Sequence, residues 1–422
     1  MAISCLHFMK GWGNWLTGQQ PVTLLLKIIL PYKCFIILNN MSEPAPHPSR
    51  LLHSSWIETL RKEAPKAELQ GQLTAKQLKL FYDHEWFKAL VPKLYGGLAW
   101  SLQKVVHFEE AIGWAEGSAG WVFTLCSGAG WFAGYIDPAM ARIIFKPKKA
   151  CLAGSGAVGG TVKSTGSGDF NLSGQWAYAT GAPHATIFTA NVYVEATKSI
   201  QPLFLFPSEV SVIKTWRPIG LKASASESFK VKRRSIPTER FFLIDPDKAV
   251  INDPLYRLPF EALAEATIAA NFSGMALRFM EEVKALWDIK NKKVMADNNS
   301  QGQEPVWMQG AVALWQKNME NWQAARRRLI HEIKGLEDFV CSHMSIPFIS
   351  SHKAYQEHSL AVSKAAQQQA AICREIVNGL YPFTGLTGAA TDSAIGKVWR
   401  DFQTGSQHAL FVPELTGTKK VK

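Results

Sequence analysis

The order of helical and strand patterns along the chain is the feature that most constrains its fold. Between residues 51 and 145, apolar residues recur at the three- and four-residue spacing of helices. Beyond residue 150, glycine-rich stretches and short alternating runs of β-branched and aromatic residues predict strands. Long segments with helical periodicity return between residues 258 and 379. This order favours an α+β protein in which a β domain is inserted between two helical parts.

Three domains are predicted: an N-terminal helical domain over residues 41–150, a β domain over 151–255 and a C-terminal helical domain over 256–422. The hydrophobic fraction of 47% is ample for their cores and excludes a disordered or coiled-coil protein. The formal net charge of +12 permits an anionic partner such as nucleic acid, a membrane surface or a substrate, but it selects none of them.

Residues 1–40 differ in composition from the rest of the chain, because they contain no acidic residue. Their apolar run over residues 22–38 is broken by Lys27, Pro31 and Lys33, so its uncharged pieces are shorter than the ~20 residues that span a bilayer. Met41 then opens a proline-rich segment typical of a disordered N-terminus. We interpret residues 1–40 as an over-extended start or a disordered N-terminus, with a membrane anchor as the alternative.

The six cysteines are scattered along the chain, with no CxxC pair and no His/Cys cluster at the spacing of a metal site. This pattern argues against a disulfide framework or a structural zinc site, and we expect no metal. It also favours a reducing compartment, so we expect a cytoplasmic protein.

Two local patterns suggest nucleotide or phosphate binding when taken alone. Residues 154–159 match GxGxxG, but a turn-rich, strand-like segment follows where a dinucleotide site needs a helix. We therefore interpret these glycines as a flexible loop running over a ligand. The triplet Arg326–Arg328 falls on a predicted amphipathic helix, and a solvated face or a subunit contact is favoured there over a phosphate site.

Two other segments carry candidate functional residues. Residues 176–184, WAYATGAPH, place a hydroxyl group and a glycine at the end of an aromatic strand. Near the C-terminus, Asp392, Arg400, Asp401 and His408 lie close together. If residues 397–410 form one helix, Asp401 and His408 share a face of it. Each of these residues, taken alone, is more often structural than functional.

Several segments, in order, resemble motifs of the acyl-CoA dehydrogenase superfamily over about residues 50–413. They are VPKLYGG at 91–97, GQWAYATG at 174–181, WRPIGLKASAS at 216–226, IP at 236–237 and VWRD at 398–401 followed by His408. The resemblance implies an N-terminal helical domain, a central β-barrel and a C-terminal four-helix bundle. It also implies a flavin cofactor, FAD or FMN, and a homotetramer or homodimer built through the bundle.

Two chemistries compete within this superfamily. The dehydrogenases desaturate acyl thioesters with a carboxylate base in an apolar pocket, where desolvation raises its pKa. Asp392 falls at one of the family's base positions, whereas residues 297–307 lack the arginine and FG that contact the adenine of FAD. The two-component monooxygenases instead take diffusible reduced flavin from a separate flavin reductase and use O2 on a small, aromatic substrate. The motif pattern favours this second branch.

The resemblance also assigns roles to individual residues. Thr180 and the backbone of Gly181 would contact the isoalloxazine ring, Ser226 would hydrogen-bond the flavin, and Trp176 would lie beside it. His408 is the acid/base candidate, and Asp392 is the base if the enzyme is a dehydrogenase. Arg400 and Asp401 are expected to fix their helix, while Trp121, Trp131 and Trp176 are candidates to line a water-excluding pocket. An alternative of another class, a non-catalytic member that binds nucleic acid, rests on the net charge and on residues 326–328, and we do not favour it.

Overall fold

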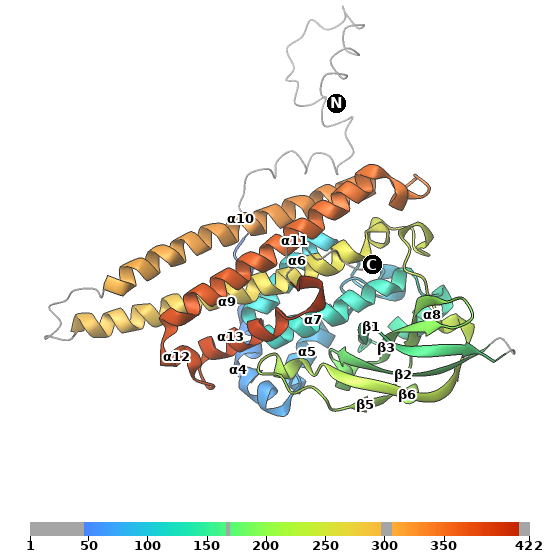
Figure 1. Cartoon of the computed structure of the whole chain (residues 1–422), viewed down its shortest axis with the longest axis horizontal. Coiled ribbons are helices and arrows are strands. Elements are labelled where there is room, and N and C mark those ends of the chain that lie inside the picture. The colour runs from blue at the N-terminus through green and yellow to red at the C-terminus, as the bar shows by residue number, and fades with distance from the viewer. Residues whose placement is uncertain (1–45, 166–168, 297–305, 413–422) are drawn as a thin grey trace, which may run out of the picture. The chain divides into compact units, whose positions relative to one another are not determined.

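The computed structural model describes residues 46–165, 169–296 and 306–412, and these residues form one compact unit. The interpretation of residues 1–40 therefore lies outside the described residues, and so does most of the segment 297–307. The order helices, strands, helices is confirmed (Figure 1). Within the described residues, no helix is both long enough and apolar enough to cross a membrane.

The N-terminal helices pack closely because small residues lie at their contacts. Glu116 alone separates α6 from α7, and its carboxylate accepts a hydrogen bond from the backbone of Ala119 (2.7 Å), which caps α7. A Cβ atom on Gly120 would lie 2.6 Å from the Cα atom of Gly113, so only glycine permits this approach of α7 to α6. The helices are α4 (Ser54–Gln70), α5 (Ala75–Asp83), α6 (Leu102–Ala115), α7 (Gly117–Gly130) and α8 (Pro138–Phe145).

The central domain is a six-stranded sheet with the order β4-β3-β1-β2-β6-β5 (Figure 1). Strands β1 and β3 are parallel, and the other neighbouring pairs are antiparallel. Within the described residues the edge strands β4 and β5 do not pair with each other, so the sheet is open and the predicted closed barrel is wrong. The strands are β1 (Leu152–Ser164), β2 (Phe170–Ala179), β3 (Ile187–Val194), β4 (Ser199–Leu205), β5 (Ser211–Ile213) and β6 (Glu227–Ile236).

The GxGxxG segment lies inside strand β1, so its interpretation as a flexible loop over a ligand is wrong. Gly159 of this segment and the following Gly160 make room for an indole ring. A Cβ atom on Gly159 would lie 2.6 Å from the ring of Trp176, and one on Gly160 would lie 2.4 Å from it. The absence of side chains at these positions therefore serves packing within the sheet.

The C-terminal part contains three long helices and two shorter ones. Helix α9 packs against α6, α11 and α13, and α10 packs against α11 (Figure 1). Helix α13 has 12 residues, whereas α9 has 37, so α13 is too short to be a full fourth member of a bundle. The predicted four-helix bundle is therefore confirmed only as a layer of helices. The helices are α9 (Phe260–Ala296), α10 (Val306–Ser342), α11 (Lys353–Leu380), α12 (Leu386–Ala389) and α13 (Ala394–Gly405).

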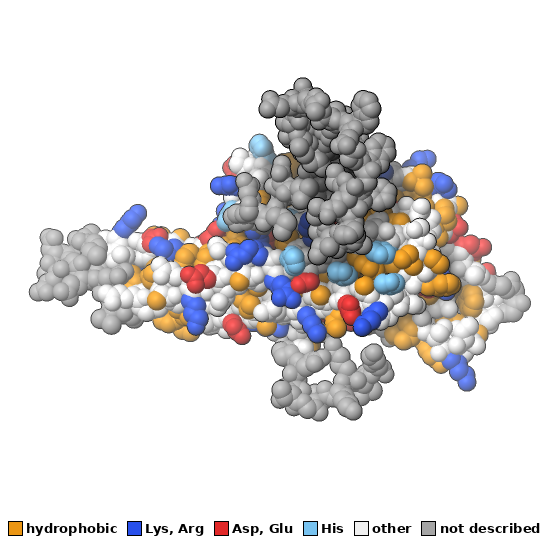
Figure 2. Space-filling view, turned by 90° about the horizontal axis from the view of Figure 1, so that it is seen from above, with side chains coloured by type: hydrophobic (Ala, Val, Ile, Leu, Met, Phe, Trp, Pro, Cys, Tyr) orange, Lys and Arg blue, Asp and Glu red, His pale blue; other side chains and the backbone are white. Residues whose placement is uncertain are grey.

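The arginine triplet on α10 does not form a basic patch. Arg326 is buried, and its guanidinium pairs with the carboxylate of Glu110 on α6, with Nε–Oε distances of 2.9 and 2.7 Å. Arg328 pairs with Glu332 on its own helix. On the face shown in Figure 2, Lys and Arg side chains are interspersed with Asp and Glu side chains. These contacts remove the structural basis for nucleic-acid binding at residues 326–328, and they make Arg326 part of the core.

Candidate functional site

Three hydroxyl groups form a buried row where β2 ends beside β6. Oγ1 of Thr180 lies 2.8 Å from Oγ of Ser226, which lies 2.8 Å from Oγ of Ser224. All three residues are at most 4% exposed. Because three hydroxyl hydrogens serve two hydrogen bonds, one hydrogen of the row is left to reach another acceptor.

The backbone around this row adopts unusual conformations. Tyr178 and Ala225 have positive φ values of 65° and 46°, and Leu221 has one of 50°. Left-handed conformations cost energy for residues other than glycine and are concentrated at functional sites. The backbone N–H of Gly181 donates to the carbonyl oxygen of Ser224 (3.0 Å). The sheet end and the segment before β6 are thereby joined.

Gly181 and Trp176 contribute differently from what the sequence predicts. The backbone N–H of Gly181 donates to Ser224, and its carbonyl accepts from His184 (3.0 Å), so this backbone is already hydrogen-bonded within the protein. The indole of Trp176 is 1% exposed, donates to the carbonyl of Asn191 (2.9 Å) and stacks on Phe229 at 5.0 Å. Trp176 therefore packs in the core of the sheet, and its place beside the flavin stays a prediction.

His408 lies just beyond helix α13, at the start of the short helix η14 (Ala409–Phe411). Because α13 ends at Gly405, the prediction that Asp401 and His408 share a helix face is wrong. The ring of His408 meets the ring of Trp121 edge to face at 5.9 Å. Burial lowers the pKa of His408, so its imidazole is neutral at neutral pH.

A hydrogen bond decides which nitrogen of neutral His408 carries the hydrogen. Nδ1 accepts from the backbone N–H of Leu410 at 3.3 Å, so the hydrogen lies on Nε2. Trp121 stacks on Phe272 at 6.2 Å, and Phe272 in turn meets Phe411 at 5.2 Å. The neutral imidazole thus offers an Nε2–H donor beside a group of aromatic rings. Three tryptophans are predicted to line the pocket. Among the described residues, the ring of Trp121 is the one of these that contacts the ring of His408.

Helix α7 brings Thr180 and His408 to one part of the molecule. The thiol of Cys126 donates to the carbonyl oxygen of Thr180 (3.4 Å), while Trp121 of the same helix contacts His408. Five residues along a helix rise by ~7.5 Å and turn by ~140° beyond one full turn. Thr180 and His408 therefore contact different faces of α7, at levels ~7.5 Å apart.

Asp401 holds the segment before Ser224 against α13. Its Oδ1 accepts from the backbone N–H of Leu221 (2.6 Å), and its Oδ2 pairs with Nζ of Lys397 (2.5 Å). Lys397 also pairs with Oε1 of Glu116 (2.5 Å), the residue that caps α7. Burial disfavours the charge on Lys397, but these two carboxylates outweigh it and raise the lysine pKa. Asp401 is therefore a positioning residue, as predicted.

Arg400 and Asp392 lie outside this arrangement. The guanidinium of Arg400 donates to Oε1 of Glu68 (3.1 Å) and to the carbonyl of Thr391 (3.0 Å), which ties α13 to α4. Asp392 lies in the turn before α13 and is exposed. This exposure does not fit the apolar pocket that a dehydrogenase base would occupy.

Sequence reasoning missed Ser224, Cys126 and the buried pairing of Lys397 with Glu116. Ser224 lies inside the segment 216–226, where its alternation with Ser226 could have suggested a shared role. Lys397 precedes Asp401 by one helical turn, a spacing that predicts an ion pair. Nothing in the local sequence indicates the contact of Cys126 with Thr180, because it joins distant segments.

Comparison with known proteins agrees with this architecture. The sequence model of the family "Acyl-CoA dehydrogenase, C-terminal domain" matches residues 266–413. The crystal structure of 3-HSA hydroxylase from Rhodococcus sp. RHA1 superposes with a TM-score of 0.74 at 20% identity, over 87% of this chain and 94% of that one. Residues 266–413 therefore match an acyl-CoA dehydrogenase C-terminal domain, and the chain shares the fold of this hydroxylase.

Two similar proteins are named as a hydroxylase and a monooxygenase. A pigment production hydroxylase of Rhodococcus sp. is 32% identical over 210 residues, which span 46% of this chain and 54% of that protein. The flavin-dependent monooxygenase oxygenase subunit HsaA of Mycobacterium tuberculosis is 22% identical over 371 residues, spanning 85% of this chain and 90% of that protein. These names agree with the predicted branch of the superfamily.

Proposed function

We propose that this chain is the oxygenase component of a two-component monooxygenase, which uses reduced flavin and O2 to hydroxylate a small aromatic substrate. The observation that carries the proposal is that α7 contacts both the backbone of Thr180, whose hydroxyl belongs to a buried row, and the neutral His408. The names of HsaA and of the hydroxylase relative support it. The exposure of Asp392 gives no support to the dehydrogenase alternative.

The residues of the site suit a flavin that is supplied in the reduced form. The hydrogen of the hydroxyl row that is not used within the row suits an acceptor atom of the flavin ring. Bound reduced flavin would supply the two electrons that activate O2. FAD and FMN both remain compatible with this proposal, as do the separate flavin reductase and the homotetramer or homodimer implied by the resemblance.

His408 would act on the substrate through its Nε2–H group. A neutral imidazole that already accepts at Nδ1 can donate from Nε2 to a phenolic oxygen or to a departing oxygen. The rings of Trp121, Phe272 and Phe411 beside it would contact an aromatic ring and exclude water. Asp401 would keep Ser224 and Ser226 in place by holding Leu221.

Reoxidation of reduced flavin tests the proposed function. The full chain is mixed anaerobically with chemically reduced FMN or FAD, then with oxygenated buffer and p-cresol as an aromatic probe. We expect the chain to slow flavin oxidation and to yield a hydroxylated product that contains oxygen from 18O2. Protein that is yellow as isolated, bleaches with an acyl-CoA and gives no labelled product would establish the dehydrogenase chemistry instead.

Removal of the Thr180 hydroxyl should weaken the binding of reduced flavin. Thr180→Val keeps the side-chain shape but breaks the row to Ser226, and a lost hydrogen bond of ~1.4 kcal/mol corresponds to about a tenfold higher Kd. The Kd is measured anaerobically by flavin fluorescence. Thr197→Val changes an exposed threonine in a distant turn and serves as the control. Equal affinities of the two variants would remove Thr180 from the flavin site.

The pKa of His408 predicts the direction of the pH dependence. Burial keeps this pKa below the ordinary value of about 6.5, so hydroxylation should be constant at neutral pH. As the pH drops through the lowered value, the hydrogen added at Nδ1 opposes the N–H of Leu410 and ends the contact that orients the ring, so hydroxylation should fall. The same group should lower the free energy of unfolding below about pH 6.5, because the unfolded chain binds the proton more readily. Product formation measured between about pH 5 and 8 checks the first effect. A flat profile would show that protonation of His408 does not matter.

A further inference from the structure

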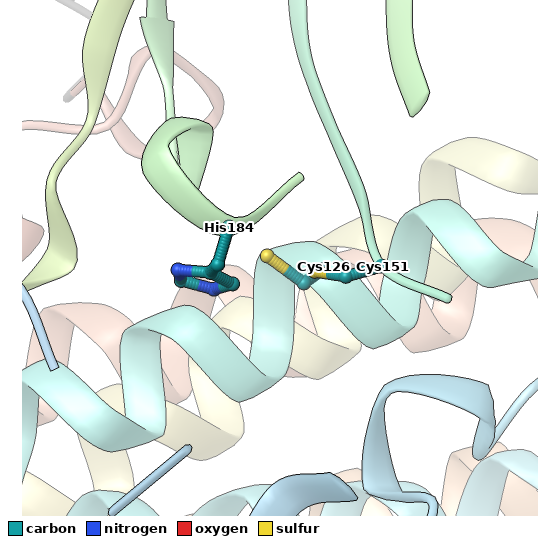
Figure 3. A group of neighbouring side chains, drawn as sticks. All are labelled: Cys126, Cys151 and His184. Carbon is teal, nitrogen blue, oxygen red and sulfur yellow. The ribbon is translucent and has the colours of Figure 1, made fainter. Parts of the chain in front are cut away.

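Two thiols and an imidazole converge next to the backbone of Thr180 (Figure 3). Cys126 belongs to α7, Cys151 immediately precedes β1, and His184 ends the short helix η6 (Ala182–His184). Their sulfur atoms and one ring nitrogen lie within 4.8 Å of one another. Both cysteines are 1% exposed, and Nε2 of His184 is buried without a hydrogen-bond partner. Buried polar atoms nearly always have a hydrogen-bond partner, so a buried imidazole nitrogen without one indicates a binding position for a ligand.

The surroundings hold these three side chains in place. The ring of His184 stacks on Phe87 at 5.5 Å, and the backbone N–H of Cys151 donates to Oγ1 of Thr186 (3.0 Å). Gly181 has a φ of +77°, and a Cβ atom there would lie 2.8 Å from the sulfur of Cys126 and 3.0 Å from Nε2 of His184. Glycine at this position therefore leaves the space beside the sulfur and the nitrogen open.

We propose that Cys126, Cys151 and His184 form a zinc site. Thiolates and imidazole are the ligands that Zn²⁺ prefers, with Zn–S bonds of about 2.3 Å, so tetrahedral geometry needs sulfur atoms ~3.8 Å apart. The observed limit of 4.8 Å is compatible with that spacing. Hard cations such as Mg²⁺ and Ca²⁺ require oxygen ligands, and none of these three residues has a carboxylate.

The charge balance also favours a divalent soft metal. Binding forms two Zn–S bonds and one Zn–N bond, and it releases two thiol protons to the solvent. Two thiolates then neutralise the charge of Zn²⁺ while the imidazole stays neutral, so the buried complex has no net charge. The carbonyl oxygen of Thr180 faces the same thiol at 3.4 Å, and it or a water molecule completes the four-coordinate shell.

The role we infer for the metal is structural. It would join α7, the start of β1 and the turn after β2, which are the three segments that supply the ligands. The sequence gives no local motif because these three residues are widely separated, and our proposal departs from the expectation that the chain has no metal site. This inference stands independently of the proposed reaction.

Metal titration of the full chain tests the proposal. Protein freed of metal under reducing conditions is titrated with Zn²⁺ by calorimetry, and with Co²⁺ by absorption spectroscopy. We expect one metal ion per chain, thiolate-to-cobalt charge-transfer bands and a higher thermal midpoint with Zn²⁺. Cys126→Ser, Cys151→Ser and His184→Gln should each weaken binding at least tenfold. Cys341→Ser changes an exposed cysteine and should leave binding unchanged.

A second measurement needs no variant and remains informative if a variant fails to fold. Zn²⁺ should protect Cys126 and Cys151 of the wild-type chain from iodoacetamide, as read by peptide mass spectrometry, while Cys341 reacts with or without metal. Three results would overturn the proposal: absence of thiolate-to-cobalt bands, alkylation of both cysteines unaffected by Zn²⁺, or a disulfide between Cys126 and Cys151 that persists under reducing conditions.

Discussion

His408→Ala should lower the rate of substrate hydroxylation by about 10²–10⁴-fold, the range for a lost proton-transfer group. The binding of reduced flavin should remain within about twofold of wild type, because we assign the flavin contact to the hydroxyl row at Thr180 and Ser226. The substitution opens space beside Trp121 but leaves Asp401 and its contact with Leu221 in place. Single-turnover product formation and the anaerobic Kd for reduced flavin measure the two effects separately.

A second substitution tells a hydrogen-bond donor from a base at this position. His408→Gln keeps an N–H donor but cannot take up a proton near neutral pH, so it should recover part of the activity if Nε2–H is the acting group. Activity as low as that of His408→Ala would instead identify proton abstraction by the imidazole. His331→Ala, which changes an exposed histidine on α10, is the control and should retain full activity. Unchanged turnover in His408→Ala would remove this residue from the mechanism.

Arg326→Met should lower the free energy of unfolding by about 3–5 kcal/mol, the cost of leaving one partner of a buried ion pair uncompensated. The carboxylate of Glu110 accepts from both Arg326 and the hydroxyl of Ser273 (2.6 Å), and the side chains of the ion pair are 7% and 4% exposed. Replacement of the arginine would leave the buried carboxylate without its cation. Urea unfolding followed by circular dichroism measures the loss.

Two further variants test whether the ion pair causes this loss. The double substitution Arg326→Met with Glu110→Leu removes both charges and should recover most of the stability. Arg327→Ala changes the exposed neighbour in the same triplet and should cost at most about 0.5 kcal/mol. An equal cost for Arg326→Met and Arg327→Ala would show that the triplet is a solvated surface after all.

The sequence allowed the order of the helical and strand parts to be predicted because periodicity is a local property. It also indicated Thr180, Ser226 and His408, through segments that resemble family motifs, and the structure brings these residues to α7 and to the end of β2. Whether they serve the assigned roles stays a prediction. The comparisons show the fold, and over residues 266–413 they show a match to the acyl-CoA dehydrogenase C-terminal domain.

The remaining features depend on contacts between distant segments. The glycines of β1 have the spacing of a nucleotide loop, yet they accommodate Trp176 from the neighbouring strand. In the sequence, Arg326 is followed by two further arginines, a pattern typical of an exposed helix face. Its partner Glu110 is brought to it only by the packing of α10 near α6. Cys126, Cys151 and His184 likewise come from three different segments, so only the fold brings them together. Local sequence carries no signal for such pairings.

The junction at Glu116 fixes how α7 can be oriented. A single residue separates α6 from α7, and that residue both caps α7 and pairs with Lys397 of α13. Insertion of one amino acid there would turn everything downstream in the helix by ~100° about its axis. Cys126 would then face away from the β2 end, and Trp121 away from the C-terminal turn. Insertions and deletions at Glu116 are therefore tolerated far less than those in the exposed turns of the sheet.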